Sequence, residues 1–321
     1  MSFSSGVKED LARIMSSKAC CRRAEFAAFF LSCGNIHIGA KHSVSLSMDA
    51  TLAVVSRKMF TLARDFGLKR EIVMHRNSRL QKNQVFSLLI PAQPAVGGLL
   101  RELGMLDEDD TWQLSFPRRL RQDFLAGECC RRAYLRGAFL AAGSLTDPGG
   151  SYHLEFAAHE PAQAELIKEL LAGFDISAKI TRRKEQPLVY LKGAEQISLL
   201  LTVLGSHRAL LEFENTRIEK EVRNRVNRQV NCDNANMDKA IASGMRQADD
   251  IRYIAAQLGL EKLPRTLREA ASWRLESPEA SLSELAETTG LGRSALNHRL
   301  RRLGEIADNI RSFGVRNWNI R

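Results

Sequence analysis

The sequence contains no apolar run of the roughly 20 residues that a membrane span requires. The segment Met1–Asp10 also lacks the hydrophobic core of a signal peptide. These two absences exclude the common membrane and secretory signals. We therefore expect a cytoplasmic protein that does not contact a membrane.

The cysteines include no Cys-x-x-Cys pair, and no histidine lies at the spacing of a zinc ligand. A cytosolic chain of this size seldom depends on a disulfide scaffold. We therefore expect reduced, mostly packed thiols, with no bound metal and no cofactor. The six residues are Cys20, Cys21, Cys33, Cys129, Cys130 and Cys232.

The composition is that of a globular protein, with 44% hydrophobic and 26% charged residues in 321. This length accommodates two or three domains. A formal net charge of +10 makes a polyanion the first partner to consider. A surface that is merely basic is the alternative.

The clearest internal feature is a repeat. Ala19–Ile36 reads ACCRRAEFAAFFLSCGNI and Glu128–Leu145 reads ECCRRAYLRGAFLAAGSL. Because Cys-Cys-Arg-Arg-Ala and the later Phe-Leu-x-x-Gly recur at the same positions of both segments, the repeat predicts two similar half-domains. The first copy predicts a helix that ends at Gly34, and the second predicts one that ends at Gly143. We expect a left-handed cap at each glycine. Small residues such as Gly137 predict that the two helices pack closely across a pseudo-twofold axis.

The pattern after each repeat helix indicates an order of two strands, a helix, two strands and a helix. In the first half the expected elements are 36–38, 44–46, 50–66, 71–75, 84–90 and 96–103. In the second half they are 152–156, 161–174, 177–181, 188–192 and 194–204.

Leu135–Gly143 resembles a degenerate LAGLIDADG motif, and Phe26–Gly34 resembles a weaker one. In the LAGLIDADG homing endonucleases the residue before the final glycine is an acid, and the two acids hold the divalent cations for DNA cleavage. The corresponding residues here are Cys33 and Ala142. A thiol and a methyl group do not supply the hard oxygen ligands that magnesium prefers. The resemblance therefore implies the scaffold without the nuclease chemistry.

The same resemblance implies two antiparallel sheets that form a saddle on a DNA duplex. Basic residues occupy matching places in the two repeats and are candidates for phosphate contacts. The alternative is a pair of solvated loops. The candidates are Arg76, Arg79, Lys82, Arg182, Arg183 and Lys184.

From Glu212 onward the pattern changes to a stretch rich in asparagine and arginine. Val222, Val226 and Val230 keep a helical period in it. We interpret the stretch as a connection between domains in which asparagines cap helix ends. Together with the repeats, it resembles the bacterial WhiA family, whose members carry a degenerate LAGLIDADG domain and a helix-turn-helix domain.

The segment Ser281–Leu303 is typical of a helix-turn-helix, with Gly290 at the turn. Leucines predict one buried face on its second helix, which leaves a polar and basic face free. A small helical bundle with a basic rim is the alternative. The candidate DNA-binding residues are Arg293, Ser294, Asn297, His298, Arg299, Arg301 and Arg302.

These observations predict an α+β protein in which a tandem LAGLIDADG-like pseudo-twofold domain precedes an all-α helix-turn-helix domain. The expected boundaries are 1–126 for the first half, 127–212 for the second, 213–236 for the connector and 237–321 for the helix-turn-helix domain.

The WhiA resemblance implies a non-enzymatic, sequence-specific transcription regulator of cell-division, chromosome-segregation or sporulation genes. Its expected partner is double-stranded DNA in the nucleoid, and another transcription regulator or RNA polymerase is a further candidate. One alternative is an active endonuclease that recruits Glu25 or Asp147 to hold metal. The other is an adaptor that binds RNA or protein.

Overall fold

The computed structural model describes residues 2–40, 43–76, 84–106, 112 and 122–314. The chain divides into two compact units, Met1–Lys220 and Glu221–Arg321. No helix in these ranges is both long enough and apolar enough to span a membrane.

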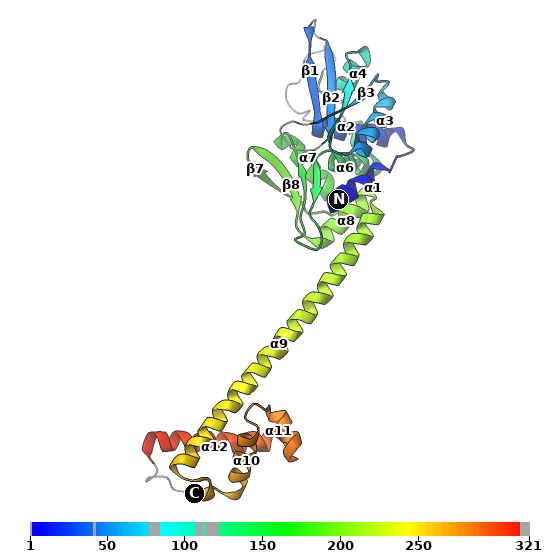
Figure 1. The fold of residues 1–321 in the computed structure, drawn as a ribbon. Coiled ribbons are helices and arrows are strands. Elements are labelled where there is room, and N and C mark those ends of the chain that lie inside the picture. Colours follow the sequence, from blue (N-terminus) through cyan, green and yellow to red (C-terminus); the bar gives the residue numbers. More distant parts are fainter. Residues whose placement is uncertain (1, 41–42, 77–83, 107–111, 113–121, 315–321) are drawn as a thin grey trace. The chain divides into compact units, whose positions relative to one another are not determined.

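The first unit contains the two predicted half-domains (Figure 1). After α1 (Phe3–Ala12), the first half consists of α2 (Ala19–Cys33), β1 (Gly34–Ile38), β2 (Val44–Ala50), α3 (Ala53–Leu62), η2 (Ala63–Phe66), β3 (Glu71–Arg76), β4 (Gln84–Ile90) and α4 (Pro94–Glu102). After α5 (Gln122–Leu125), the second half consists of α6 (Glu128–Ala142), β5 (Gly143–Leu145), β6 (Leu154–Ala157), α7 (Pro161–Ala172), β7 (Lys179–Arg183), β8 (Gln186–Leu191) and α8 (Ala194–Leu204).

Each half forms one four-stranded antiparallel sheet. The strand order is β1-β2-β4-β3 in the first half and β5-β6-β8-β7 in the second. The predicted order of helices and strands is therefore confirmed, and so is the duplication. The sequence pattern had not given β5 its own range, because a strand of three residues is too short to show a period.

The helices that carry the repeat, α2 and α6, pack against each other at the centre of the unit. A Cβ atom added to Gly137 of α6 would lie under 3.0 Å from the backbone carbonyl oxygen of Glu25 in α2. Ala27 and Ala28 of α2 and Ala138 of α6 are buried. This contact confirms the prediction that small residues let the two helices approach closely.

The expected left-handed caps at Gly34 and Gly143 are wrong. Both glycines are extended, with φ and ψ of −82° and 145° at Gly34 and −83° and 152° at Gly143. Each one begins a strand directly after its helix. A Cβ atom at Gly34 would lie under 3.0 Å from the carbonyl oxygen and ring of Phe30. A Cβ atom at Gly143 would lie equally close to the carbonyl oxygen and ring of Phe139. Glycine is therefore required here for space.

A buried ionic cluster joins the central helices to their neighbours. The carboxylate of Glu25, which is 0% exposed, accepts from Lys58 Nζ at 2.7 Å and from Arg136 Nε at 3.0 Å. Lys58 also donates to the carbonyl oxygens of Leu11 and Ile14, at the end of α1. Both cations face Oε1, while Oε2 of Glu25 is buried without a hydrogen-bond partner among the described residues. The two cations compensate a charge that would otherwise be costly to bury.

The segment 213–236 lies wholly inside one helix, α9 (His207–Gln257). The expectation that its asparagines cap helix ends is therefore wrong, because the stretch contains neither the glycine nor the proline that would interrupt a helix. Every side chain from Glu221 to Lys239 is exposed, including Val222, Val226 and Val230. The domain limits given above stay a prediction.

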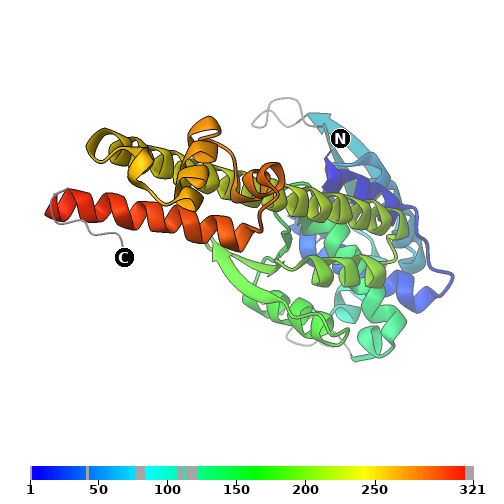
Figure 2. The same cartoon turned by 90° about the horizontal axis from the view of Figure 1, so that it is seen from below.

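The second unit has its own hydrophobic core, to which the end of α9 contributes Ile251 and Ile254. The remaining elements are η3 (Leu260–Lys262), α10 (Arg265–Glu276), α11 (Leu282–Thr289) and α12 (Arg293–Phe313). In Figures 1 and 2, α12 packs against the end of α9, where Arg311 Nη2 donates to Asp250 at 2.6 Å.

Candidate nucleic-acid interface

The helix-turn-helix is formed by α11 and α12. Ser281 caps α11 through a reciprocal capping box with Glu284, in which each side chain accepts from the other residue's backbone N–H. Gly290 ends the helix in the left-handed region at φ 68°, and Gly292 is the N-cap of α12. Local sequence thus fixes both the start and the turn of the motif.

A buried arginine positions the loop that leads into α11. Arg274 of α10 is 1% exposed and donates through Nη1 to the carbonyl oxygens of Ala280 at 2.6 Å and Ser277 at 3.3 Å. Burial lowers the pKa of its guanidinium below the ordinary value. Sequence reasoning missed this residue, because an arginine between apolar helical positions gives no sign of which loop it will hold.

One face of α12 is apolar and one is polar. Leu296, Leu300 and Leu303 are buried, as predicted. Arg293, Ser294, Asn297 and His298 are exposed on the first two turns. Within the described ranges, no hydrogen bond or ion pair engages these four side chains, so they are available to a ligand.

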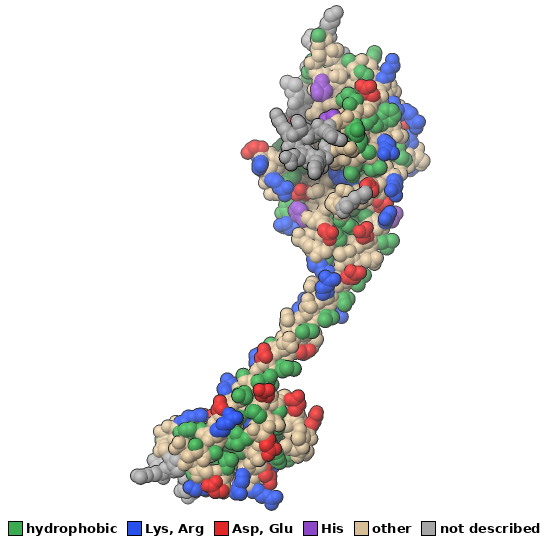
Figure 3. All heavy atoms as spheres, viewed as in Figure 1, with side chains coloured by type: hydrophobic (Ala, Val, Ile, Leu, Met, Phe, Trp, Pro, Cys, Tyr) green, Lys and Arg blue, Asp and Glu red, His purple; other side chains and the backbone are tan. Residues whose placement is uncertain are grey.

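The three remaining candidates on α12 differ from one another in their surroundings. Arg299 is half-buried, whereas Arg301 and Arg302 are exposed. Arg302 Nη1 lies 2.9 Å from Glu305 Oε2, and Arg301 Nε lies 3.5 Å from Oε1 of the same residue. The hydrogen bond from Arg302 lowers the pKa of the Glu305 carboxyl. Figure 3 shows Lys and Arg side chains interspersed with acidic ones on one face of this unit.

The basic residues of the second hairpin lie where β7 turns into β8. Arg182, Arg183 and Lys184 are all exposed, and Lys184 takes a positive φ of 49° at the turn. Arg183 Nη2 lies 3.3 Å from the Glu155 carboxylate on β6. Arg182 and Lys184 have no such partner among the described residues, so two of the three cations are free at this edge of the sheet.

The first hairpin is described only in part. Arg76 is the last residue of β3, the strand that matches β7, while Arg79 and Lys82 lie outside the described residues. The equivalence of the two hairpins is therefore supported by strand order but not by side-chain positions.

Cys33 and Ala142 end the two central helices, where the nuclease family carries its acids. The Cys33 thiol donates to the carbonyl oxygen of Phe29 at 3.2 Å. Burial raises its pKa to about 12, and the nearby Asp49 carboxylate adds to the rise. Burial also lowers the pKa of Lys8 to about 8, although the Cys33 thiolate opposes this change. The Lys8 side chain and the Cys33 thiol therefore interact electrostatically at the end of α2.

The two acids that an active nuclease would have to recruit lie in different environments. Glu25 is held inside the protein by Lys58 and Arg136. Asp147 is exposed in a turn, where its carboxylate accepts from the backbone N–H of Gly149 at 2.8 Å. Neither residue ends a central helix.

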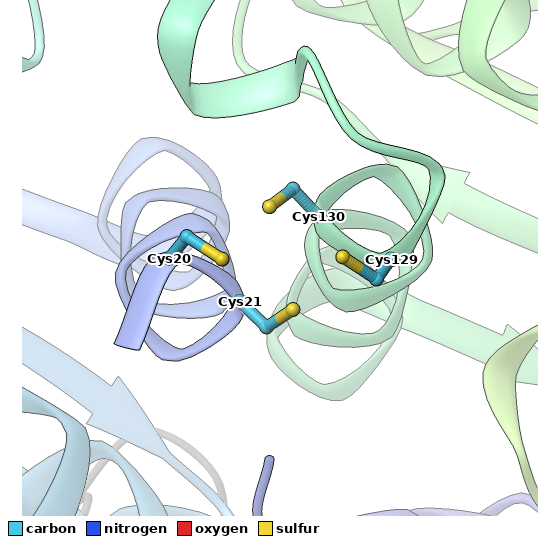
Figure 4. Close-up of side chains that lie close together, drawn as sticks. All are labelled: Cys20, Cys21, Cys129 and Cys130. Carbon is cyan, nitrogen blue, oxygen red and sulfur yellow. The ribbon is translucent and has the colours of Figure 1, made fainter. Parts of the chain in front are cut away.

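The structure also brings together four cysteines that sequence reasoning treated as separate thiols. Cys20 and Cys21 lie in the first turn of α2, and Cys129 and Cys130 lie in the first turn of α6. Their four sulfur atoms all lie within 4.8 Å of one another (Figure 4). The available signal was the Cys-Cys pair at the same register of both repeats.

Known proteins match nearly all of the chain. The model of the WhiA N-terminal LAGLIDADG-like domain matches residues 19–106, that of the WhiA LAGLIDADG-like domain matches 131–223, and that of the WhiA C-terminal HTH domain matches 226–307. The chain is 44% identical to the probable cell division protein WhiA of Desulforamulus reducens, over 97% of both chains. It is 42% identical to that of Heliobacterium modesticaldum, over 96% of both.

Among solved structures, the crystal structure of full-length DUF199/WhiA from Thermatoga maritima matches with a TM-score of 0.58 and 25% identity. The match covers 96% of this chain and 99% of that one. The two LAGLIDADG-like halves and the helix-turn-helix are therefore shared with a solved protein.

Proposed function

Because the chain belongs to the WhiA family, we propose that it is a sequence-specific DNA-binding transcription regulator. The observation that carries this proposal is the polar face of α12, where Arg293, Asn297 and His298 are exposed and unpartnered within the described ranges. The genes it would control concern cell division, as the names of its relatives indicate, or chromosome segregation or sporulation.

In the proposed complex the first turns of α12 enter the major groove. Arg293 can donate two hydrogen bonds to guanine, and Asn297 can pair with adenine through its amide. Ser294 and His298 lie close enough in sequence to reach neighbouring base edges. Arg301, one turn after Asn297, would contact a further base edge, and Arg299 and Arg302 would reach the flanking phosphates.

The experiment is to select bound fragments from a genomic library with the full chain, and then to measure affinity for the selected duplex and a scrambled one as salt rises. A sequence reader retains its preference at high salt, whereas nonspecific binding falls with the phosphate contacts. We expect Asn297→Ala to lose about 1–3 kcal/mol of discrimination. Asn309→Ala is the matched control, because Asn309 is exposed further along the same helix.

Equal loss on both duplexes from Asn297→Ala would contradict base reading by α12. Single-stranded or structured RNA that competes as well as the selected duplex would replace the proposal with an RNA-binding adaptor.

The tandem LAGLIDADG-like unit is proposed to add phosphate contacts or a surface for another regulator or for RNA polymerase. We expect the double change Arg182→Ala and Arg183→Ala to weaken binding to both duplexes alike and to reduce the salt dependence. Loss of preference for the selected duplex in this variant would instead assign base reading to the hairpin.

We also propose that the chain is not a nuclease. The proposal is supported by the thiol and methyl group at Cys33 and Ala142, and by the two cations that neutralise Glu25. Incubation with plasmid DNA and magnesium or manganese tests it. Reproducible nicking by the wild-type chain that Asp147→Ala abolishes would restore the endonuclease alternative.

A further inference from the structure

The strongest feature that the proposed function leaves unused is the set of four cysteines at the starts of α2 and α6. Each helix contributes the second and third residues of its first turn, counted from the N-caps Lys18 and Gly127. In Figure 4 the four sulfur atoms point into one space between the two helix ends. The cluster is therefore built symmetrically by the two copies of the repeat.

The sulfur positions suit a single metal ion. Four thiolates at a Zn–S distance of about 2.3 Å around a tetrahedral zinc have sulfur atoms about 3.8 Å apart. The four sulfurs here all lie within 4.8 Å of one another. This upper limit exceeds the tetrahedral separation by about 1 Å, which metal binding would have to close.

Simple packing explains only part of the cluster. Cys21 and Cys130 are 3% and 4% exposed, and they pack with Ala24 and Ala133 as small apolar side chains would. Cys20 is exposed, however, and Cys129 is half-buried. A packing role does not require a thiol at those two positions, whereas a four-ligand site does.

Two helix N-termini meet at the cluster. Four thiolates and one Zn²⁺ carry a net charge of −2, and the first turns of two fifteen-residue helices direct backbone N–H groups at the site. These N–H groups would partly compensate the charge that metal binding leaves.

We propose that Cys20, Cys21, Cys129 and Cys130 bind one Zn²⁺ ion, which ties α2 to α6 at the pseudo-twofold axis. On binding, each thiol releases its proton to solvent and no group is oxidised or reduced. All four coordination positions are filled by the protein, so the site is structural and leaves no place for a substrate.

The test is to titrate the reduced, metal-free chain with Co²⁺ under anaerobic conditions and then to add Zn²⁺. We expect thiolate-to-cobalt charge-transfer bands and intense tetrahedral d–d bands that saturate at one Co²⁺ per chain, and their loss when Zn²⁺ displaces the cobalt. Metal analysis of the chain purified from zinc-supplemented cells should give one zinc per chain. Neither readout depends on DNA binding, so failure of this proposal and failure of the proposed function are distinguishable.

Cys20→Ser and Cys129→Ser each remove one ligand that is not fully buried, so both variants should retain their circular dichroism spectrum. We expect each to lose the tetrahedral cobalt spectrum, while Cys232→Ser, at an exposed thiol on α9, leaves it unchanged. The proposal is overturned if the reduced chain gives no such spectrum, or if the spectrum survives in both cluster variants. A brown chromophore with iron and inorganic sulfide in the purified chain would also overturn it.

Discussion

At the scale of single residues, the carboxylate of Glu25 is both fully buried and charged. It lies between two cations inside the first unit and connects α2 to α3 and α6. Removal of one member of a buried ion cluster leaves the others charged and without compensation. Replacement of Glu25 should therefore lower the stability of the fold and leave the proposed DNA-binding surface unchanged.

We expect Glu25→Ala to lower the free energy of unfolding by about 3–5 kcal/mol, measured by urea denaturation followed by circular dichroism. Glu165→Ala is the control, because Glu165 forms only an exposed pair with Lys168 on α7, and we expect a change below about 0.5 kcal/mol. Similar values for the two variants would contradict the role assigned to the buried cluster.

The Cys33 thiol gives a second prediction at this scale. Its pKa of about 12, raised from 9.0 mainly by burial, leaves about 10³-fold less thiolate at pH 8 than an ordinary thiol has. Because the thiolate is the reactive form, we expect Cys33 to react with iodoacetamide far more slowly than the exposed Cys232, and its rate to keep rising up to pH 11. Peptide mass spectrometry measures both rates, and a plateau for Cys33 below pH 9 would show that its pKa is not raised.

At the scale of helices and strands, the contact between α2 and α6 depends on one position without a side chain. Gly137→Ala places a Cβ atom against the backbone of Glu25, which cannot move as a flexible side chain would. We expect a loss of about 1–3 kcal/mol from this overpacking, measured as above.

Gly98→Ala provides the matched control for that change. Gly98 also lies inside a helix, α4, but a Cβ atom added there meets nothing within 4 Å. Alanine should therefore stabilise this helix by about 0.5–1 kcal/mol. If both substitutions were stabilising, the close approach of α2 and α6 would not exist in solution.

The elements were predictable to different degrees from the sequence. The repeat gave both central helices and the order of strands, because duplication makes two weak patterns agree. The conformation of Gly34 was not predictable, since it depends on where the Phe30 ring lies. The cysteine cluster was missed for a similar reason: neither Cys-Cys pair has the spacing of a metal site, and the four thiols meet only when α2 packs on α6.

On the scale of the whole molecule, α9 contains the longest run of exposed residues in the described part of the chain. The side chains from Glu221 to Lys239 are all exposed, whereas the buried residues of each unit lie before or after this stretch. Helical segments without packing open at low cost in free energy.

We expect limited trypsin digestion to cut first within this stretch, after Arg223, Arg225, Arg228 or Lys239, and to leave two resistant fragments. Gel electrophoresis and intact-mass measurement would identify the sites. First cuts inside α2 or α12 would show that the expected connector at 213–236 is misplaced.

The close contact of α2 and α6 has a consequence for any attempt to divide the first unit. Each half, made alone, would expose to water the small apolar side chains with which α2 and α6 contact each other, such as Ala24, Ala28 and Ala133. Bacteria that express one half by itself should accumulate insoluble material, and simultaneous expression of both should rescue solubility by reassembly. Each half therefore depends on the other for its solubility, so a substitution in the contact surface of one half also affects the other.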